Sequence, residues 1–131
     1  MSPSDIPGRF QNPAYALLRM VSGLNLASHG SQKLFGLFGG RLASFPSQYW
    51  LGGLIELSCG LAIALGWGAR WAAFLASGTM AVAYFQFHWK LQAGAMFMPV
   101  VNKGELALVY CFLFLFFFTR GNGHWCLGRR S

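Results

Sequence analysis

The stretch from Gly104 to Thr119 limits what this chain can fold into more than any other segment. After Glu105 come fourteen residues without a charged side chain, and five of them are phenylalanine. A soluble domain would have to bury such a segment on every side, whereas the hydrocarbon of a bilayer solvates it readily. The segment therefore predicts a membrane-spanning helix over 104–119.

The composition of the whole chain also favours a membrane protein. Of its 131 residues, 55% are hydrophobic and 10% are charged, against about 25% charged residues in soluble domains. A membrane span needs about 20 apolar residues, so four spans with short connections use up this length. We predict an all-α integral membrane protein, a four-helix antiparallel bundle, with no separate soluble domain.

Loop residues and prolines divide the chain. Prolines mark residues 1–13 as an N-terminal tail, and glycine, serine and proline mark 38–48 as a loop. The predicted spans are 14–37, 49–67, 69–88 and 104–119. The transmembrane domain then covers 14–120, and a basic C-terminal tail covers 121–131. The first span is the most polar of the four, and a helix that lies on the membrane surface is an alternative interpretation of it.

The net charge of +7 is spread along the chain. Nucleic-acid binding would need a basic stripe on one element, and none is present. The expected partners of these side chains are anionic lipid headgroups. An even number of spans places both termini on one side of the membrane. That side carries five basic side chains, or six if Arg19 reaches the nearer surface, and the opposite side carries four. The positive-inside rule therefore predicts cytoplasmic termini.

Long amphipathic side chains near the ends of spans are typical of the membrane interface. We expect five residues to act as interfacial anchors: Arg19, Trp50, Trp67, Trp71 and Trp89.

Ionisable side chains gather in one half of the predicted bundle. His29 and Lys33 lie near the end of the first span, Glu56 lies about two turns into the second, His88 ends the third and Glu105 opens the fourth. Each ionisable group inside a span costs roughly 2.5–3.5 kcal/mol, so such groups face the protein interior, pair with one another or line a wet cavity. The expected partners of Glu56 are Lys33 and His29.

Two interpretations of this cluster remain open, and they can coexist. In the first, Glu56 bonds to a basic neighbour and only fixes how the helices pack. In the second, the cluster forms a polar pocket for the head of a quinone or another small amphiphile, where His29 and His88 exchange protons and Lys33 holds an anionic or carbonyl oxygen. A metal site of His29, His88 and Glu56 would lack any fixed ligand spacing, so we predict no metal.

Three runs of sequence carry a resemblance to a known family. They are LLRMVSGLNLASHGSQKLFGLFGG at 17–40, WLGGLIELSCGLAIALGWGARWAA at 50–73 and NKGELALVYCFLFL at 102–115. Together they resemble the DoxX family of small bacterial membrane proteins, whose name comes from a subunit of a thiosulfate:quinone oxidoreductase. The resemblance implies a four-helix bundle in the bacterial inner membrane without an intrinsic cofactor motif. By motif match, His29, Lys33, Glu56 and Glu105 fall at the family's characteristic polar positions.

The resemblance also implies a function class. Other members are linked with membrane-associated oxidoreductase complexes and with oxidative-stress or thiol defence. The expected function is therefore a small membrane subunit that supports or docks a redox complex of other membrane proteins, with quinone as a candidate ligand. A purely structural accessory subunit and a stand-alone quinone-linked oxidoreductase are the alternatives. The chain lacks a CxxC pair for thiol redox chemistry of its own.

Overall fold

The computed structural model describes residues 2–129, and this part of the chain is helical, without strands. Four long helices dominate it: α2 (Gln11–Phe35), α3 (Gln48–Leu65), α4 (Ala69–Ala83) and α6 (Glu105–Arg120). The shorter elements are α1 (Ile6–Arg9), α5 (Pro99–Asn102), the 3-10 helices Pro3–Asp5, Leu37–Gly39 and Gly94–Phe97, and a π-helical segment, η3 (Tyr84–Trp89), which continues α4. The all-α prediction is confirmed, and the predicted spans match these helices to within three residues at each end when η3 is counted with α4.

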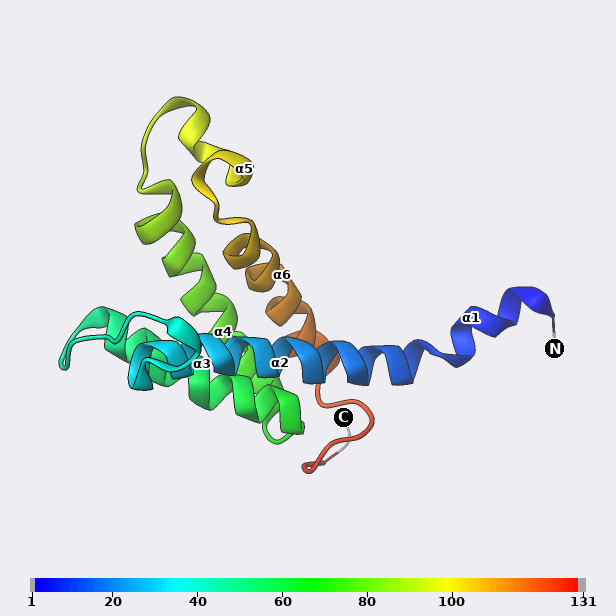
Figure 1. Ribbon diagram of the computed structural model, residues 1–131. Helices are drawn as coiled ribbons and strands as arrows, with labels where there is room; N and C mark the ends of the chain where they lie inside the picture. The colour runs from blue at the N-terminus through cyan, green and yellow to red at the C-terminus, as the bar shows by residue number, and fades with distance from the viewer. Residues whose placement is uncertain (1, 130–131) are drawn as a thin grey trace.

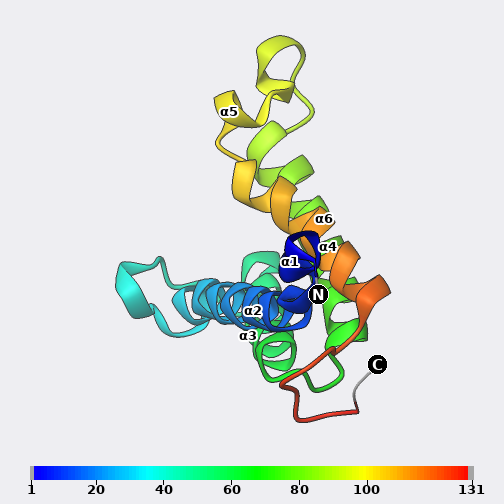
Figure 2. The same ribbon diagram turned by 90° about the vertical axis from the view of Figure 1, so that its right-hand side faces the viewer.

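The long helices form two antiparallel pairs. α2 packs along α3, α4 packs along α6, and α3 connects the pairs through its contact with α4. In Figure 1 the α2–α3 pair runs across the view while α4 and α6 rise away from it, and the pairs still diverge in the view turned by 90° in Figure 2. Tyr15 and Asn25, which contact α6, both lie in the first two thirds of α2. The described residues therefore form two crossed antiparallel pairs that are open at one end, and the four-helix bundle expected from the sequence stays a prediction.

Four glycines hold α2 and α3 together, and we call them the glycine seam: Gly23, Gly30, Gly53 and Gly60. A Cβ atom on Gly23 would lie 2.5 Å from the backbone nitrogen of Ala64, and one on Gly60 would lie 2.5 Å from that of Ala27. The two helices thus touch backbone to backbone, as small residues permit in membrane helix pairs. The seven-residue spacing on each helix keeps both contacts on one face.

A different packing joins α4 to α6. The buried residues of α4 are mostly small, whereas those of α6 are mostly aromatic. The facing sets are Ala69, Ala73, Ala76, Ser77 and Met80 on α4, and Ala107, Tyr110, Phe114 and Phe117 on α6. Large rings on one helix fill the space left by small side chains on the other, which gives a dense core.

The C-terminal tail is folded onto the turn between α3 and α4. Gly66 and Gly68 form this turn with φ values of +68° and +62°, a backbone conformation that glycine adopts without strain. The backbone nitrogens of Leu127 and Gly128 donate to the carbonyl oxygens of Leu65 and Gly66. The described part of the predicted tail, 121–129, is thus held against the helix ends, while residues 130 and 131 lie outside the described residues.

Among the described helices, α3 alone is both long and apolar enough to cross a membrane on length and composition. α4 has 15 residues and α6 has 16, so each is shorter than this criterion requires. α2 has 25 residues but is markedly more polar.

The glycine seam generates a stability prediction. Gly60→Ala should lower the free energy of unfolding by about 1–3 kcal/mol, because the added methyl group overlaps the backbone of α2. Gly52→Ala, on the same helix, is the control: nothing lies within 4 Å of its Cβ position, so the better helix former should be neutral or stabilising by up to about 1 kcal/mol. Denaturant titration in mild detergent measures the free energy of unfolding of both variants. Equal changes in the two would contradict the close backbone contact at Gly60.

Candidate functional site

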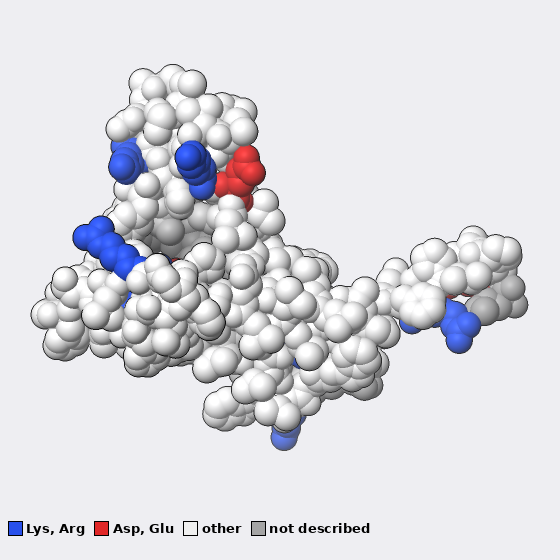
Figure 3. Space-filling model, in the orientation of Figure 1, with Lys and Arg blue, Asp and Glu red and all other residues white. Residues whose placement is uncertain are grey.

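A cavity of about 850 Å³ opens where the α2–α3 pair diverges from the α4–α6 pair. Figure 3 shows the hollow between the two arms of the molecule, with Lys and Arg side chains on both arms beside it. Most of its wall is apolar, including Leu26, Ile55, Leu75, Met80, Phe87 and Leu106. This volume and lining are typical of small-molecule sites. At the open end, the Gln48 Nε2 group donates a hydrogen bond to Gln86 Oε1 (2.5 Å), which links α3 to η3.

Four of the five polar residues predicted for the pocket line this cavity: His29, Lys33, Glu56 and His88. The fifth, Glu105, does not, because it is exposed at the first position of α6 and is absent from the wall. The expectation that Glu105 joins the pocket is therefore wrong for the described structure. Lys103 takes the place on the wall that we had expected for Glu105.

Glu56 and Lys33 form an ion pair inside the protein. The Lys33 Nζ atom lies 2.6 Å from Glu56 Oε1, and the exposed fractions of the two side chains are 19% and 5%. This confirms that Glu56 pairs with a basic residue of the preceding helix, and the partner is Lys33. The glycine seam makes the pair possible, because a Cβ on Gly53 would lie 2.7 Å from Lys33 Cβ. The stem of Lys33 crosses α3 at a position that has no side chain.

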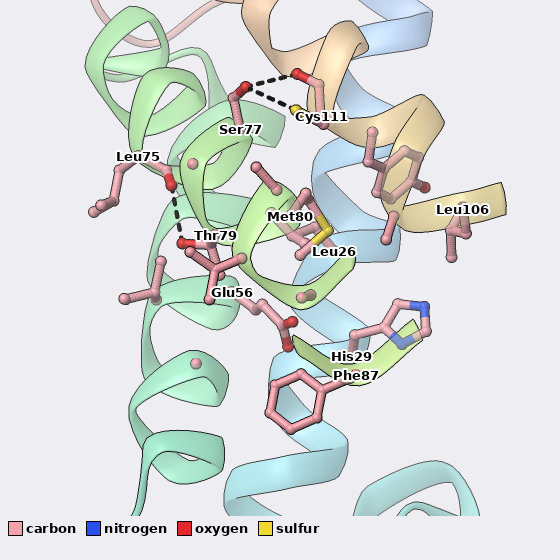
Figure 4. A pocket seen from close by; sticks show the side chains of 18 of the residues that line it. Leu26, His29, Glu56, Leu75, Ser77, Thr79, Met80, Phe87, Leu106 and Cys111 are labelled. Atoms are coloured by element: carbon pink, nitrogen blue, oxygen red, sulfur yellow. Dashed lines mark hydrogen bonds between the residues drawn. The ribbon is translucent and has the colours of Figure 1, made fainter. Parts of the chain in front are cut away.

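The other carboxylate oxygen of Glu56 lacks a partner. Oε2 is buried, and no residue within 2–129 donates a hydrogen bond to it. Figure 4 shows the Glu56 carboxylate among the side chains that line the cavity. A buried acceptor without a donor costs about 1–3 kcal/mol or more, and native proteins rarely leave one unpaired. The unpaired Oε2 atom is thus the feature of the cavity that most strongly indicates a ligand.

His88 reaches the cavity from the π-helical segment. In a π-helix each backbone hydrogen bond spans one residue more than in an α-helix. Such segments are frequent at functional sites. The sequence predicted a continuous helix to residue 88 and did not reveal this segment. His88 Nδ1 lies 3.3 Å from the carbonyl oxygen of Asn102. The buried Asn102 side chain donates to Met96 O (2.8 Å) and Tyr84 Oη (3.2 Å), which holds the connection between α4 and α6 in place.

Tyr110 is a polar wall residue that the sequence did not single out. It lies on α6, its side chain is buried, and its hydroxyl accepts a hydrogen bond from Asn25 Nδ2. Since this oxygen accepts from Asn25, its own proton remains available to a molecule in the cavity. The one sequence signal is that Tyr110 interrupts an otherwise apolar stretch of the fourth span.

Comparison with known proteins establishes the family. The DoxX family profile matches residues 14–89. This chain belongs to the DoxX family. An uncharacterized protein of Haemophilus influenzae is 38% identical to it over 112 residues, which cover 82% of this chain and 83% of that protein. No solved structure matches the chain. Membership supports a membrane protein that associates with the lipid bilayer.

Arg19 of this DoxX protein is not an interfacial anchor, contrary to our expectation. Its side chain is fully buried, and its guanidinium donates to backbone carbonyl oxygens at the end of α3 and in the C-terminal tail. The acceptors are the carbonyls of Ile63, Ala64, Asn122, His124 and Trp125. The carbonyls at a helix C-terminus have no partner within the helix and carry partial negative charge, so a cation satisfies them. Arg19 thus fastens the tail to α2 and α3.

The four tryptophans that we predicted as anchors lie in two groups. Trp67 and Trp71, each 69% exposed, flank the turn between α3 and α4. Trp50, in the first turn of α3, and Trp89, at the end of η3, are half-buried. Their role as membrane anchors stays a prediction. Within residues 2–129, no three His, Cys, Asp or Glu side chains are grouped so as to hold a metal ion.

The ion pair predicts a non-additive pair of substitutions. Lys33→Met should lower the free energy of unfolding by about 3 kcal/mol, near the low end for a buried pair that loses one partner, because Glu56 keeps an uncompensated charge. Adding Glu56→Gln should recover part of this loss, since the charge is then gone. Lys103→Met, on the same cavity wall, is the control and should change stability by less than about 1 kcal/mol. A double variant as unstable as Lys33→Met would show that the charges do not interact.

The Arg19 contacts predict a loose tail when the guanidinium is shortened to an amine. Arg19→Lys should destabilise the protein by about 2 kcal/mol or more, because one ammonium cannot reach several separate carbonyl groups. Limited chymotrypsin digestion should then cleave faster after Trp125. Arg41→Lys, at an exposed arginine, keeps the wild-type cleavage rate. An unchanged cleavage rate in Arg19→Lys would show that Arg19 does not hold the tail in place.

Proposed function

We propose that this DoxX protein is a small multi-pass subunit of the bacterial inner membrane that supports or docks a redox complex, and that its cavity admits the head group of a quinone. One observation carries the proposal. The cavity between the helix pairs is largely apolar but contains Lys33, two histidines and a buried carboxylate with one unpaired oxygen. Such a lining suits an amphiphile whose rings or tail are apolar and whose head makes hydrogen bonds.

The proposed membrane placement rests on α3 and the tryptophans. From Gln48 to Leu65, α3 rises about 26 Å at 1.5 Å per residue, close to the hydrocarbon thickness of about 30 Å, and Trp50 and Trp67 lie near its two ends. Large exposed apolar side chains such as Leu17, Val21 and Phe112 would then contact lipid. With all four long helices embedded and the termini cytoplasmic, the cavity lies toward the periplasmic leaflet, where a lipid-soluble ligand can enter from the side.

The residues present fit a quinone. A quinone, when bound, supplies two-electron and two-proton exchange between membrane enzymes. In this chain Lys33 and Tyr110 can donate to ring oxygens, and Leu26, Met80 and Leu106 can contact the ring or its tail. The imidazole nitrogens of His29 and His88 line the same cavity and can donate or accept a hydrogen bond at the head. Since the cavity is open between the helix pairs, ligand exchange needs no unfolding of either pair.

A structural accessory subunit is the second candidate function, and the ion pair favours it. Lys33 and Glu56 join α2 to α3 whatever the cavity holds. In that case, the protein would contribute its packed surfaces to a larger membrane complex, and the cavity residues would tolerate substitution without loss of assembly. Purification in mild detergent, followed by identification of co-eluting proteins, tests the assembly part of both candidates.

A variant that fills the cavity tests the quinone site. Gly78 lines the cavity, and no atom lies within 4 Å of its Cβ position, so Gly78→Phe should occupy the cavity without displacing the backbone. We expect extractable quinone per protein, and binding of decylubiquinone, to fall at least tenfold. Val21→Phe, at a position 65% exposed on α2, is the matched control and should bind normally. Equal binding by both variants would place the ligand elsewhere.

A further inference from the structure

We propose that the cavity selects a head group that donates a hydrogen bond, and thus holds the hydroxyl-bearing quinol more tightly than the quinone. The inference rests on the proposed function, because it names which form of the ligand the site prefers. Its basis is the unpaired oxygen of Glu56.

The charge state of Glu56 determines what that oxygen can bind. With the Lys33 ammonium 2.6 Å from Oε1, the side chain is held as a carboxylate. An ionised carboxylate only accepts hydrogen bonds. A ligand that approaches Oε2 must therefore bring the proton itself.

Residues 2–129 offer no donor of their own to Oε2. Lys33 is engaged with Oε1, and neither His29 nor Tyr110 bonds to Oε2, although both line the same cavity. The remaining occupant is water, which can satisfy a buried acceptor when other polar partners are near. If water occupies Oε2, the site should bind quinol and quinone with equal affinity. Comparing the two affinities therefore distinguishes water from a ligand hydroxyl at this oxygen.

The two forms of the ligand differ most at this oxygen. The carbonyl oxygen of a quinone presents lone pairs to the carboxylate, whereas a quinol hydroxyl donates a hydrogen bond to a charged acceptor, which is the stronger kind. Where Lys33 or Tyr110 donates to the head, a hydroxyl oxygen accepts as a carbonyl oxygen does. The preference therefore arises at Glu56, and a hydrogen bond to a charged group corresponds to about tenfold or more in affinity.

Preferential binding of one form has an electrochemical consequence. If the quinol binds tenfold more tightly than the quinone, the midpoint potential of the bound two-electron couple rises by about 30 mV. A potentiometric titration of the quinone with and without the protein reads this shift independently of any enzymatic activity.

The test uses three probes with the same decyl tail and the full-length protein in lipid nanodiscs under anaerobic conditions. The probes are decylubiquinol, decylubiquinone and the 1,4-dimethyl ether of decylubiquinol, which keeps the ring and tail of the quinol but has no hydroxyl donor. Calorimetry should show that the quinol binds the wild-type protein about tenfold more tightly than either other probe, above partition into empty nanodiscs.

Two variants locate the preference. Glu56→Gln replaces the carboxylate with an amide that both donates and accepts, so the ratio between quinol and quinone should fall to within about threefold. Glu105→Gln removes the same charge outside the cavity and should keep the wild-type ratio. The wild-type comparison stands alone if Glu56→Gln does not fold. Equal affinities for the three probes in the wild type would overturn the preference and leave the quinone site standing, whereas no binding of any probe would overturn the proposed function itself.

Discussion

The contact between the bare backbones of α2 and α3 is the constraint on which the rest depends. Because Gly23, Gly30, Gly53 and Gly60 carry no side chains, the two helices lie closer than any larger residue would allow. This closeness lets the stem of Lys33 pass over α3 and bring its ammonium to Glu56. A buried carboxylate is tolerated at that depth only with such a partner. The seam therefore determines where a charge can exist inside the protein.

The two cations of α2 illustrate two different uses of buried charge. The Arg19 guanidinium donates to carbonyl oxygens of α3 and the tail, and these bonds join the two segments. The Lys33–Glu56 pair lies toward the other end of the helix and leaves Oε2 unpaired. A closed polar network stabilises one packing arrangement, whereas an incomplete one beside a cavity is open to a further molecule.

Some of this arrangement could be predicted from the sequence. Long apolar runs and loop residues located the four helices, and the scarcity of ionisable residues led to Lys33 as a partner of Glu56. The seven-residue spacing of the seam glycines was also readable. The burial of Arg19 could not be predicted, because three of its five acceptors belong to a tail whose path depends on tertiary contacts. Glu105 was misplaced because small rotations of a helix decide which way its first residue faces, and the divergence of the pairs is not encoded in periodicity.

The joining of the two pairs at one end gives the cavity a mechanical property. The pairs are joined by the turn at Gly66 and Gly68, which can act as a pivot, and their far ends are linked by the Gln48–Gln86 hydrogen bond. With arms of about 27 Å, from 18 residues at 1.5 Å each, a rotation of about 5° at the pivot moves the far ends by roughly 2 Å. A rotation of that size would separate Gln48 from Gln86 beyond hydrogen-bonding distance, so this contact limits how far the pairs can open.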